Sequence, residues 1–158
     1  MNKLKSKADI DIDINDMIRC ANEFYTISQN KKTFIPNFAI LAFACELYMK
    51  TILFYHTKNF PKCHDLGCLY IEISKHFNKS EFIKIFAEQM RKLFDDYSIE
   101  SSEQSLMETL HKNSNMFEDW RYLFEKKIDK PYAVHGFLLQ LSEALRLYVD
   151  RFIRKEQK

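Results

Sequence analysis

A pair of opposite charges lies in the middle of the longest apolar stretch of this 158-residue chain. Glu46 and Lys50 are four residues apart, so on a helix they share one face and can form an ion pair. The residues around them are almost all apolar, and charges held among such residues must be paired, because an unpaired buried charge is strongly destabilising. The sequence therefore predicts a buried polar centre on this helix.

Two other parts of the sequence can supply partners for this pair. His64 and Asp65 follow after a short connection and, because the next helix is expected to be antiparallel, they are predicted near the end of the apolar helix rather than at its middle. Arg121 and Glu125 are again four residues apart. We expect side chains from these separate elements to meet at one interior binding site, made of Glu46, Lys50, His64, Asp65, Arg121, Tyr122 and Glu125.

This polar centre has two interpretations. It can be a structural network that fixes helix register, since buried ion pairs often give specificity of packing. Alternatively, Arg121 and Lys50 hold a phosphate or another anion, for which the planar fork of arginine is well suited. If the chain is an enzyme, the catalytic candidates are His64 and Arg121, because a histidine can act as acid or base near neutral pH.

The cysteines of the chain favour neither a metal site nor a disulfide framework. Cys63 and Cys68 flank His64, but four residues separate them and no second pair follows, so neither a metal nor another cofactor is expected. Cys20 and Cys45 lie inside apolar helical patterns. This usage favours a reducing, cytoplasmic location.

The composition predicts an all-helical domain. Only 2 Gly and 3 Pro are present, whereas strand-rich folds need frequent turns built from those residues, and the 14 Phe and 8 Tyr supply bulky core side chains. A formal net charge of +2 is too balanced to direct the whole molecule onto nucleic acid or an anionic membrane, so any basic surface must be local. Charges at the centre of the longest apolar stretch argue against a membrane span.

Apolar periodicity divides the chain into an arm and one domain. Residues 1–14 form an N-terminal extended arm in which acid and isoleucine alternate, and residues 15–158 form a single helical domain that begins with Asn15 or Asp16 as N-cap. The second helix is apolar nearly all round and should lie at the centre. We predict an all-α, up-and-down bundle of five to six helices, with helices over 15–30, 36–56, 64–77, 81–97, 101–112 and from residue 131 onward, and a compact turn or helix over 115–127.

Three short motifs, in this order, resemble the HEPN superfamily of helical domains from prokaryotic conflict and defence systems. They are an Ala-x-Glu-x-x-x-Lys helix, a His-Asp-Leu helix start and a Trp-Arg-Tyr stretch, and they extend over roughly residues 36–125. The resemblance implies a HEPN-like bundle that is commonly a homodimer and, in many members, a metal-independent ribonuclease. The matching residues are Ala44, Glu46, Lys50, His64, Asp65, Leu66, Trp120, Arg121 and Tyr122.

The ribonuclease motif of that family is not present in this chain. In the motif a histidine follows an arginine after four to six residues, and no arginine of this sequence has a histidine at that spacing. Members without the motif are generally regarded as binding or assembly modules. We therefore predict a HEPN-like module of a bacterial defence or toxin–antitoxin system that acts by dimerisation and by binding RNA or a protein encoded by a neighbouring gene. The alternative is a metal-independent endoribonuclease that uses Arg121 with a spatially adjacent histidine.

Overall fold

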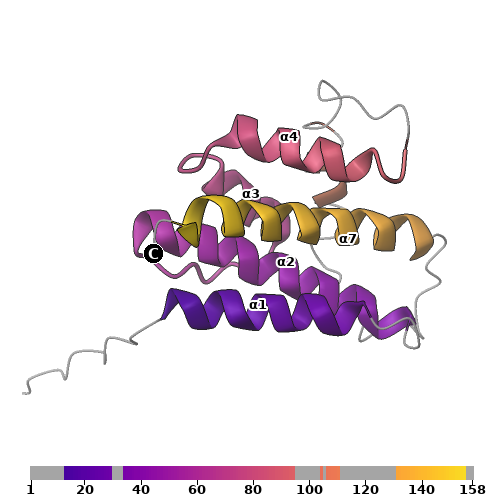
Figure 1. Ribbon diagram of the computed structural model, residues 1–158, viewed down its shortest axis with the longest axis horizontal. Helices are drawn as coiled ribbons and strands as arrows, with labels where there is room; N and C mark the ends of the chain where they lie inside the picture. Colours follow the sequence, from indigo (N-terminus) through magenta and orange to yellow (C-terminus); the bar gives the residue numbers. More distant parts are fainter. Residues whose placement is uncertain (1–12, 30–33, 95–103, 105, 111–130, 156–158) are drawn as a thin grey trace, which may run out of the picture.

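The computed structural model describes residues 13–29, 34–94, 104, 106–110 and 131–155, and every regular element in these ranges is a helix (Figure 1). The prediction of an all-α helical bundle is confirmed. The elements are α1 (Ile14–Ser28), α2 (Phe34–Thr57), α3 (Leu66–Ile73), α4 (Lys79–Met90) and α7 (Pro131–Tyr148), which continues directly into the π-helix η1 (Val149–Ile153).

Helix α2 is the central element of the bundle, as its apolar surface predicts. It packs against α1, α3, α7 and η1, while α4 packs against α7 (Figure 1). A helix that is contacted from several sides needs apolar residues all round, whereas its neighbours need only one apolar stripe each. The largest fully buried side chains come from α1 to α4 and the helical residues 106–110: Ile18, Leu41, Tyr48, Met49, Ile52, Leu69, Tyr70, Ile73, Phe82, Phe86, Leu106 and Leu110.

The segment Asn37–Thr57 of α2 is long and apolar enough to cross a membrane by length and composition, with a mean hydropathy of 1.5. In the bundle, however, 72% of the 18-residue window that meets this test is buried inside the protein. A core helix passes the same test as a membrane span, and the packing of α2 against α1, α3 and the continuous helix α7–η1 fits the core helix that the sequence predicts.

Two helices begin one or more residues away from their predicted starts. Asp13, not Asn15 or Asp16, is the N-cap of α1, because its Oδ1 accepts a hydrogen bond from the backbone N–H of Asn15 at 2.8 Å. Asp65 precedes α3 as its N-cap instead of lying in the first turn, and its Oδ1 accepts from the N–H of Cys68 at 2.7 Å. In both cases the carboxylate satisfies a backbone donor that the first turn leaves unpaired. The remaining arm, residues 1–12, lies outside the described residues.

Helix α4 ends at Met90 and not near residue 97, as its apolar periodicity predicts. The backbone N–H groups of Lys92 and Leu93 donate to carbonyls three residues back, at 3.1 and 2.9 Å, which tightens the chain into a turn and stops the α-helix. Leu93 is consequently exposed rather than part of a buried stripe. The predicted fifth helix is described only at residues 104 and 106–110, which are helical, and the predicted element at 115–127 lies outside the described residues.

A charged network ties α1 to the C-terminal helix. Arg146 donates through Nε and Nη2 to both carboxylate oxygens of Glu143, at 2.9 and 2.8 Å, and through Nη1 to Asp150 at 3.1 Å. Its guanidinium also lies 5.7 Å from the ring centre of Tyr25 on α1. The hydrogen bonds from Arg146 lower the pKa of Glu143, while burial, with the hydrogen bond to Glu143, raises the pKa of Tyr25 to about 12.

Candidate functional site

The predicted ion pair lies in the interior of α2. Lys50 Nζ is 2.8 Å from Glu46 Oε1, and the two side chains are only 4% and 10% exposed. The pair forms because residues four apart on a helix face each other. It is buried because the rest of α2 is covered by neighbouring helices on several sides. Both charges are therefore held where water screens them little, so each depends on the other.

The residues that follow α2 bring a histidine to this pair. His64 Nδ1 is 2.8 Å from Glu46 Oε1, the same oxygen that contacts Lys50. The predicted position of His64 near the end of α2 is therefore wrong. Residues 58–65, here called the return segment, lead back along α2, so that α3 starts beside the middle of α2 instead of beyond its end.

Helices α2 and α3 consequently run in the same direction. The start of α3 lies near Glu46, and its far end lies near the end of α2, where His56 and His76 line one cleft of about 490 Å³. The rest of the lining of this cleft consists of Leu53, Thr57, Asn59, Pro61 and Glu72. Figure 1 shows the two helices side by side, with the short turn from α3 into α4 at the same end of the bundle.

Lys50 has no open path to a ligand in the described part of the chain. Its ammonium contacts Glu46 on one side and lies 5.3 Å from the ring centre of Phe60 on another. Phe60 comes from the return segment and is itself 44% exposed. This residue was not predicted as part of the site. The aromatic ring lies over the ammonium and covers one side of it.

His64 is placed differently from the lysine. Its side chain is 78% exposed, although Nδ1 is held by a carboxylate that is almost completely buried. The contact to Nδ1 leaves Nε2 as the ring nitrogen available to solvent or to a ligand. A carboxylate that orients an imidazole through one nitrogen is the arrangement that proteins use to prepare the other nitrogen for proton transfer or binding.

Three of the predicted site residues lie outside the described residues. These are Arg121, Tyr122 and Glu125, so their meeting with Glu46 and Lys50 stays a prediction. Asp65 is described, and its carboxylate caps α3. Among the described residues, the predicted site therefore brings together one ion pair and one histidine from two separate elements.

The return segment also carries basic residues that the motif search missed. Lys58 and Lys62 are exposed, and from residue 56 to residue 64 the sequence has two lysines, two histidines and no acidic residue. Lys58 lies 5.3 Å from the ring centre of Tyr55. The absence of acidic residues from these nine positions can be seen in the sequence. It indicates a basic surface only once the structure shows that the lysines are exposed.

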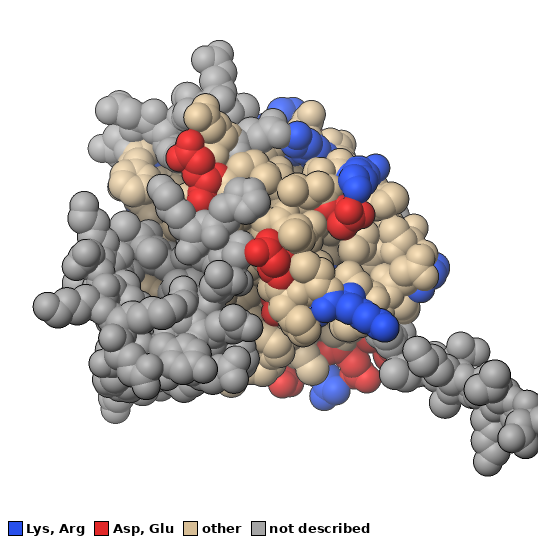
Figure 2. Space-filling view, turned by 180° about the vertical axis from the view of Figure 1, so that it is seen from behind, with Lys and Arg blue, Asp and Glu red and all other residues tan. Residues whose placement is uncertain are grey.

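Charge on the rest of the visible surface is mixed. Figure 2 shows Lys and Arg side chains spread over the right-hand part of the described surface, with Asp and Glu between them and tan residues separating most of them. This fits the formal net charge of +2. Electrostatic binding to a polyanion would therefore have to be local, as the composition predicts.

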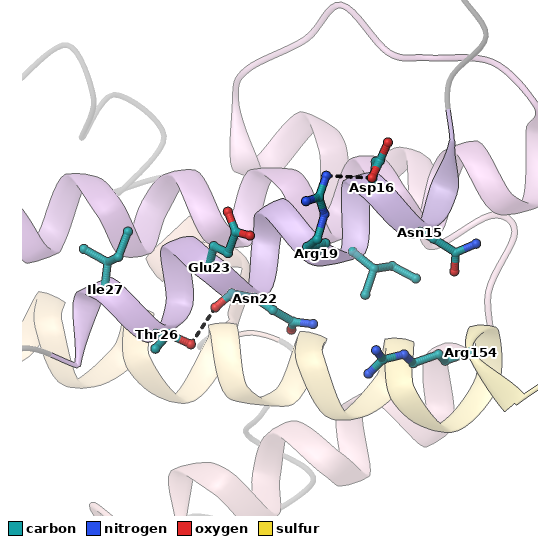
Figure 3. Close-up of a pocket in the computed structure, with 9 residues that line it drawn as sticks. Asn15, Asp16, Arg19, Asn22, Glu23, Thr26, Ile27 and Arg154 are labelled. Atoms are coloured by element: carbon teal, nitrogen blue, oxygen red, sulfur yellow. Dashed lines mark hydrogen bonds and ion pairs between the residues drawn. The ribbon is translucent and has the colours of Figure 1, made fainter.

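A second hollow lies along α1. It has a volume of about 690 Å³, and Figure 3 shows Asn15, Asn22 and Arg154 between α1 and η1. Three of its four charged side chains are paired within the protein, because Arg19 pairs with Asp16 at 2.8 Å and Arg154 with Asp150 at 3.3 Å. Asn22 Oδ1 accepts from the hydroxyl of Tyr48 at 2.7 Å. These internal contacts account for most of the polar lining without a ligand.

No group of three or more His, Cys, Asp or Glu side chains suited to a metal ion occurs among the residues that the structure describes. Comparisons of the chain with family models, with curated proteins and with solved structures found no match. The fold and the site thus define an all-α bundle with a buried Glu–Lys pair that holds an exposed histidine. The likeness to the HEPN superfamily stays a prediction.

Proposed function

We propose that the protein is a HEPN-like helical module of a bacterial defence or toxin–antitoxin system, and that it binds single-stranded RNA through its return segment. The observation that carries this proposal is the exposure of Lys58, Phe60, Lys62 and His64 on one eight-residue segment without an acidic side chain before Asp65. We call these four residues the return surface. Lysines attract backbone phosphates, and an exposed aromatic ring offers a face on which a base can stack.

The buried charges support a binding role for this segment in an indirect way. Glu46 anchors His64, and Lys50 lies against Phe60, so the two ends of the polar centre fix two members of the return surface. Lys50 then acts as a structural cation under the surface rather than as a phosphate ligand. A pre-organised segment loses less conformational entropy when it binds than a free loop does.

The test is the affinity of the full chain for an unstructured RNA oligonucleotide, measured by fluorescence anisotropy at several salt concentrations. Lys58→Gln with Lys62→Gln should weaken binding roughly tenfold at low salt and reduce the salt slope by about 1.4, since each lost phosphate contact on a single strand contributes about 0.7. The matched control is Lys84→Gln with Lys92→Gln on and after α4, which removes the same charge from another exposed place. Equal loss in both double variants, or no RNA binding by the parent protein, would contradict the proposal and would direct the search to a protein partner.

A second candidate function is supported by the geometry of His64. Because Glu46 holds Nδ1, the exposed imidazole is prepared to act as acid or base at Nε2, as a metal-independent endoribonuclease requires. Arg121, the predicted phosphate-binding partner, lies outside the described residues. The same RNA incubated with the protein in EDTA separates the two functions: intact RNA supports the binding module, and cleavage that is lost in His64→Gln supports the enzyme.

The proposal includes a homodimer, which rests on the resemblance and on a surplus of aromatic side chains, 14 Phe and 8 Tyr, for one small bundle. We expect a mass in solution of twice the 19.0 kDa of one chain, measured by light scattering over a range of protein concentrations. A mass of one chain at the highest concentration would remove the dimer from the proposal. It would leave the return surface untouched, because that surface belongs to one chain.

A further inference from the structure

Two thiols lie at the junction of the return segment and α3. Cys63 is half-buried near the end of the return segment, and Cys68 is exposed in the first turn of α3. Both are free thiols, and both are accessible to small molecules to some degree. Cys20 is half-buried on α1, and Cys45 is fully buried on α2, so the chain offers internal controls.

The capping geometry of α3 brings the two cysteines to the same residue, Asp65. Asp65 is the N-cap, which makes Cys68 the third residue of the helix, and a side chain at that position reaches back toward the backbone N–H of the N-cap. That same N–H donates to the Sγ of Cys63, at 3.4 Å. Both cysteines therefore contact Asp65, Cys63 through its sulfur and Cys68 through its backbone N–H, which donates to Asp65 Oδ1 at 2.7 Å.

The electrostatics of Cys68 agree with this proximity. The carboxylate of Asp65 and then the neighbouring thiol of Cys63 raise the pKa of Cys68 above its ordinary value of 9.0. A raised pKa keeps the thiol protonated near neutral pH. It makes Cys68 slow to react there rather than unreactive, because the thiolate is the attacking form.

We propose that Cys63 and Cys68 are a redox modification site that closes into a reversible intramolecular disulfide by exchange with a low-molecular-weight disulfide of the glutathione type. In the first step one protein thiol loses its proton and attacks the small disulfide, forming a mixed disulfide and releasing one small thiol. In the second step the other protein thiol loses its proton and attacks the protein sulfur, forming the Cys63–Cys68 bond and releasing the second small thiol. The protein pair loses two electrons and two protons, and the small disulfide gains them.

The disulfide would enclose His64 and Asp65 in a six-residue loop. Such a loop restricts the unfolded chain and holds the N-cap of α3 beside the contact between His64 and Glu46. We therefore expect the oxidised protein to melt roughly 4 to 8 °C higher than the reduced protein. This inference does not rest on RNA binding, since mass and melting temperature report it directly.

The experiment incubates the full chain with oxidised glutathione and reads the intact mass under non-reducing conditions, followed by peptide mapping. The expected product has lost two hydrogen atoms, carries a Cys63–Cys68 link and returns to the starting mass with dithiothreitol. Its rate of formation should rise with pH above neutrality, because more thiolate becomes available. In Cys68→Ser the reaction should stop at a glutathione adduct on Cys63.

Cys20→Ser is the matched control and should form the same link at the same rate as the parent protein. Three results would overturn the proposal: a parent protein that carries only glutathione adducts, a disulfide between two chains in place of the internal one, or a link that maps to Cys20. A melting temperature unchanged by a mapped Cys63–Cys68 link would overturn the expected effect on α3. Because Cys68 is exposed, Cys68→Ser should fold normally, which its melting curve checks.

Discussion

Replacing Glu46 with glutamine is expected to lower the free energy of unfolding by about 3 to 5 kcal/mol, the range found when one member of a buried ion pair is removed. Glutamine has nearly the same shape as glutamate but no charge. The ammonium of Lys50 would then stay in the interior with 4% of its side chain exposed and, among the described residues, with no carboxylate paired with it. The histidine contact would weaken as well, because the same oxygen holds His64.

Chemical denaturation of the purified chain measures this loss, and two variants make the result specific. Glu46→Met with Lys50→Met removes both charges at similar volume and should be close to the parent protein or more stable than it. Lys84→Met breaks an exposed ion pair on α4, where Lys84 and Glu81 are 2.9 Å apart, and should cost less than about 1 kcal/mol. A Glu46→Gln protein within about 1 kcal/mol of the parent would show that the pair is not desolvated, contrary to its burial.

The ion pair of the polar centre was predictable from the sequence, but the route by which His64 reaches it was not. Spacing on α2 is enough to pair Glu46 with Lys50, and the apolar surroundings are enough to bury them. The position of His64 is not decided by spacing. From Glu46 to Thr57 the helix rises by about 16 Å, at about 1.5 Å per residue. The eight residues of the return segment can extend over about 26 Å. The segment is therefore long enough either to turn tightly into an antiparallel helix or to run back along α2 as far as Glu46.

Which of these two paths the segment follows depends on side-chain contacts that do not recur at a regular spacing in the sequence. Phe60 lies against Lys50, and Cys63 packs against the core, so the segment finds partners along α2 that a simple turn would leave unused. A search for helices and turns treats these residues as a connection. The return segment is therefore both the part of the site that sequence reasoning placed wrongly and the part that carries the proposed binding surface.

Helix ends show the same limit on a smaller scale. Alternation of acid and isoleucine predicts an extended arm through residue 14, yet Asp13 caps α1, and Ile14 is already helical. The alternating pattern covers few residues, and the capping bond of a single carboxylate is sufficient to end it. In α4, apolar spacing continues beyond Met90 although the backbone turns there. Periodicity reports which residues can share a face and does not report where the chain leaves the helix.

Replacing Arg146 with methionine is the second large change, and its effect should depend on pH. Methionine keeps the apolar stem but removes the two hydrogen bonds to Glu143, the bond to Asp150 and the contact with Tyr25. Charge-assisted hydrogen bonds contribute about 1.5 to 3 kcal/mol each when well buried, but partial exposure of this network limits the whole loss to about 1 to 2 kcal/mol near pH 7. Lys84→Met, which breaks the exposed ion pair with Glu81 on α4, is the control and should cost less than about 1 kcal/mol.

The sign of the pH dependence follows from Glu143. Its pKa is lowered in the folded protein from the ordinary value of 4.5, first by the hydrogen bonds from Arg146, so the contribution to stability is present above pH 4.5 and is lost as the pH falls through the folded pKa. Without Arg146 the burial of Glu143 opposes ionisation instead. The difference in unfolding free energy between the parent and Arg146→Met should therefore be largest near neutral pH and shrink below pH 4.5. Denaturation curves at a series of pH values measure this difference. A difference that stays constant down to pH 3, roughly one unit below an ordinary carboxyl pKa, would contradict this expectation. It would mean that Arg146 stabilises the bundle through its packing and not through Glu143.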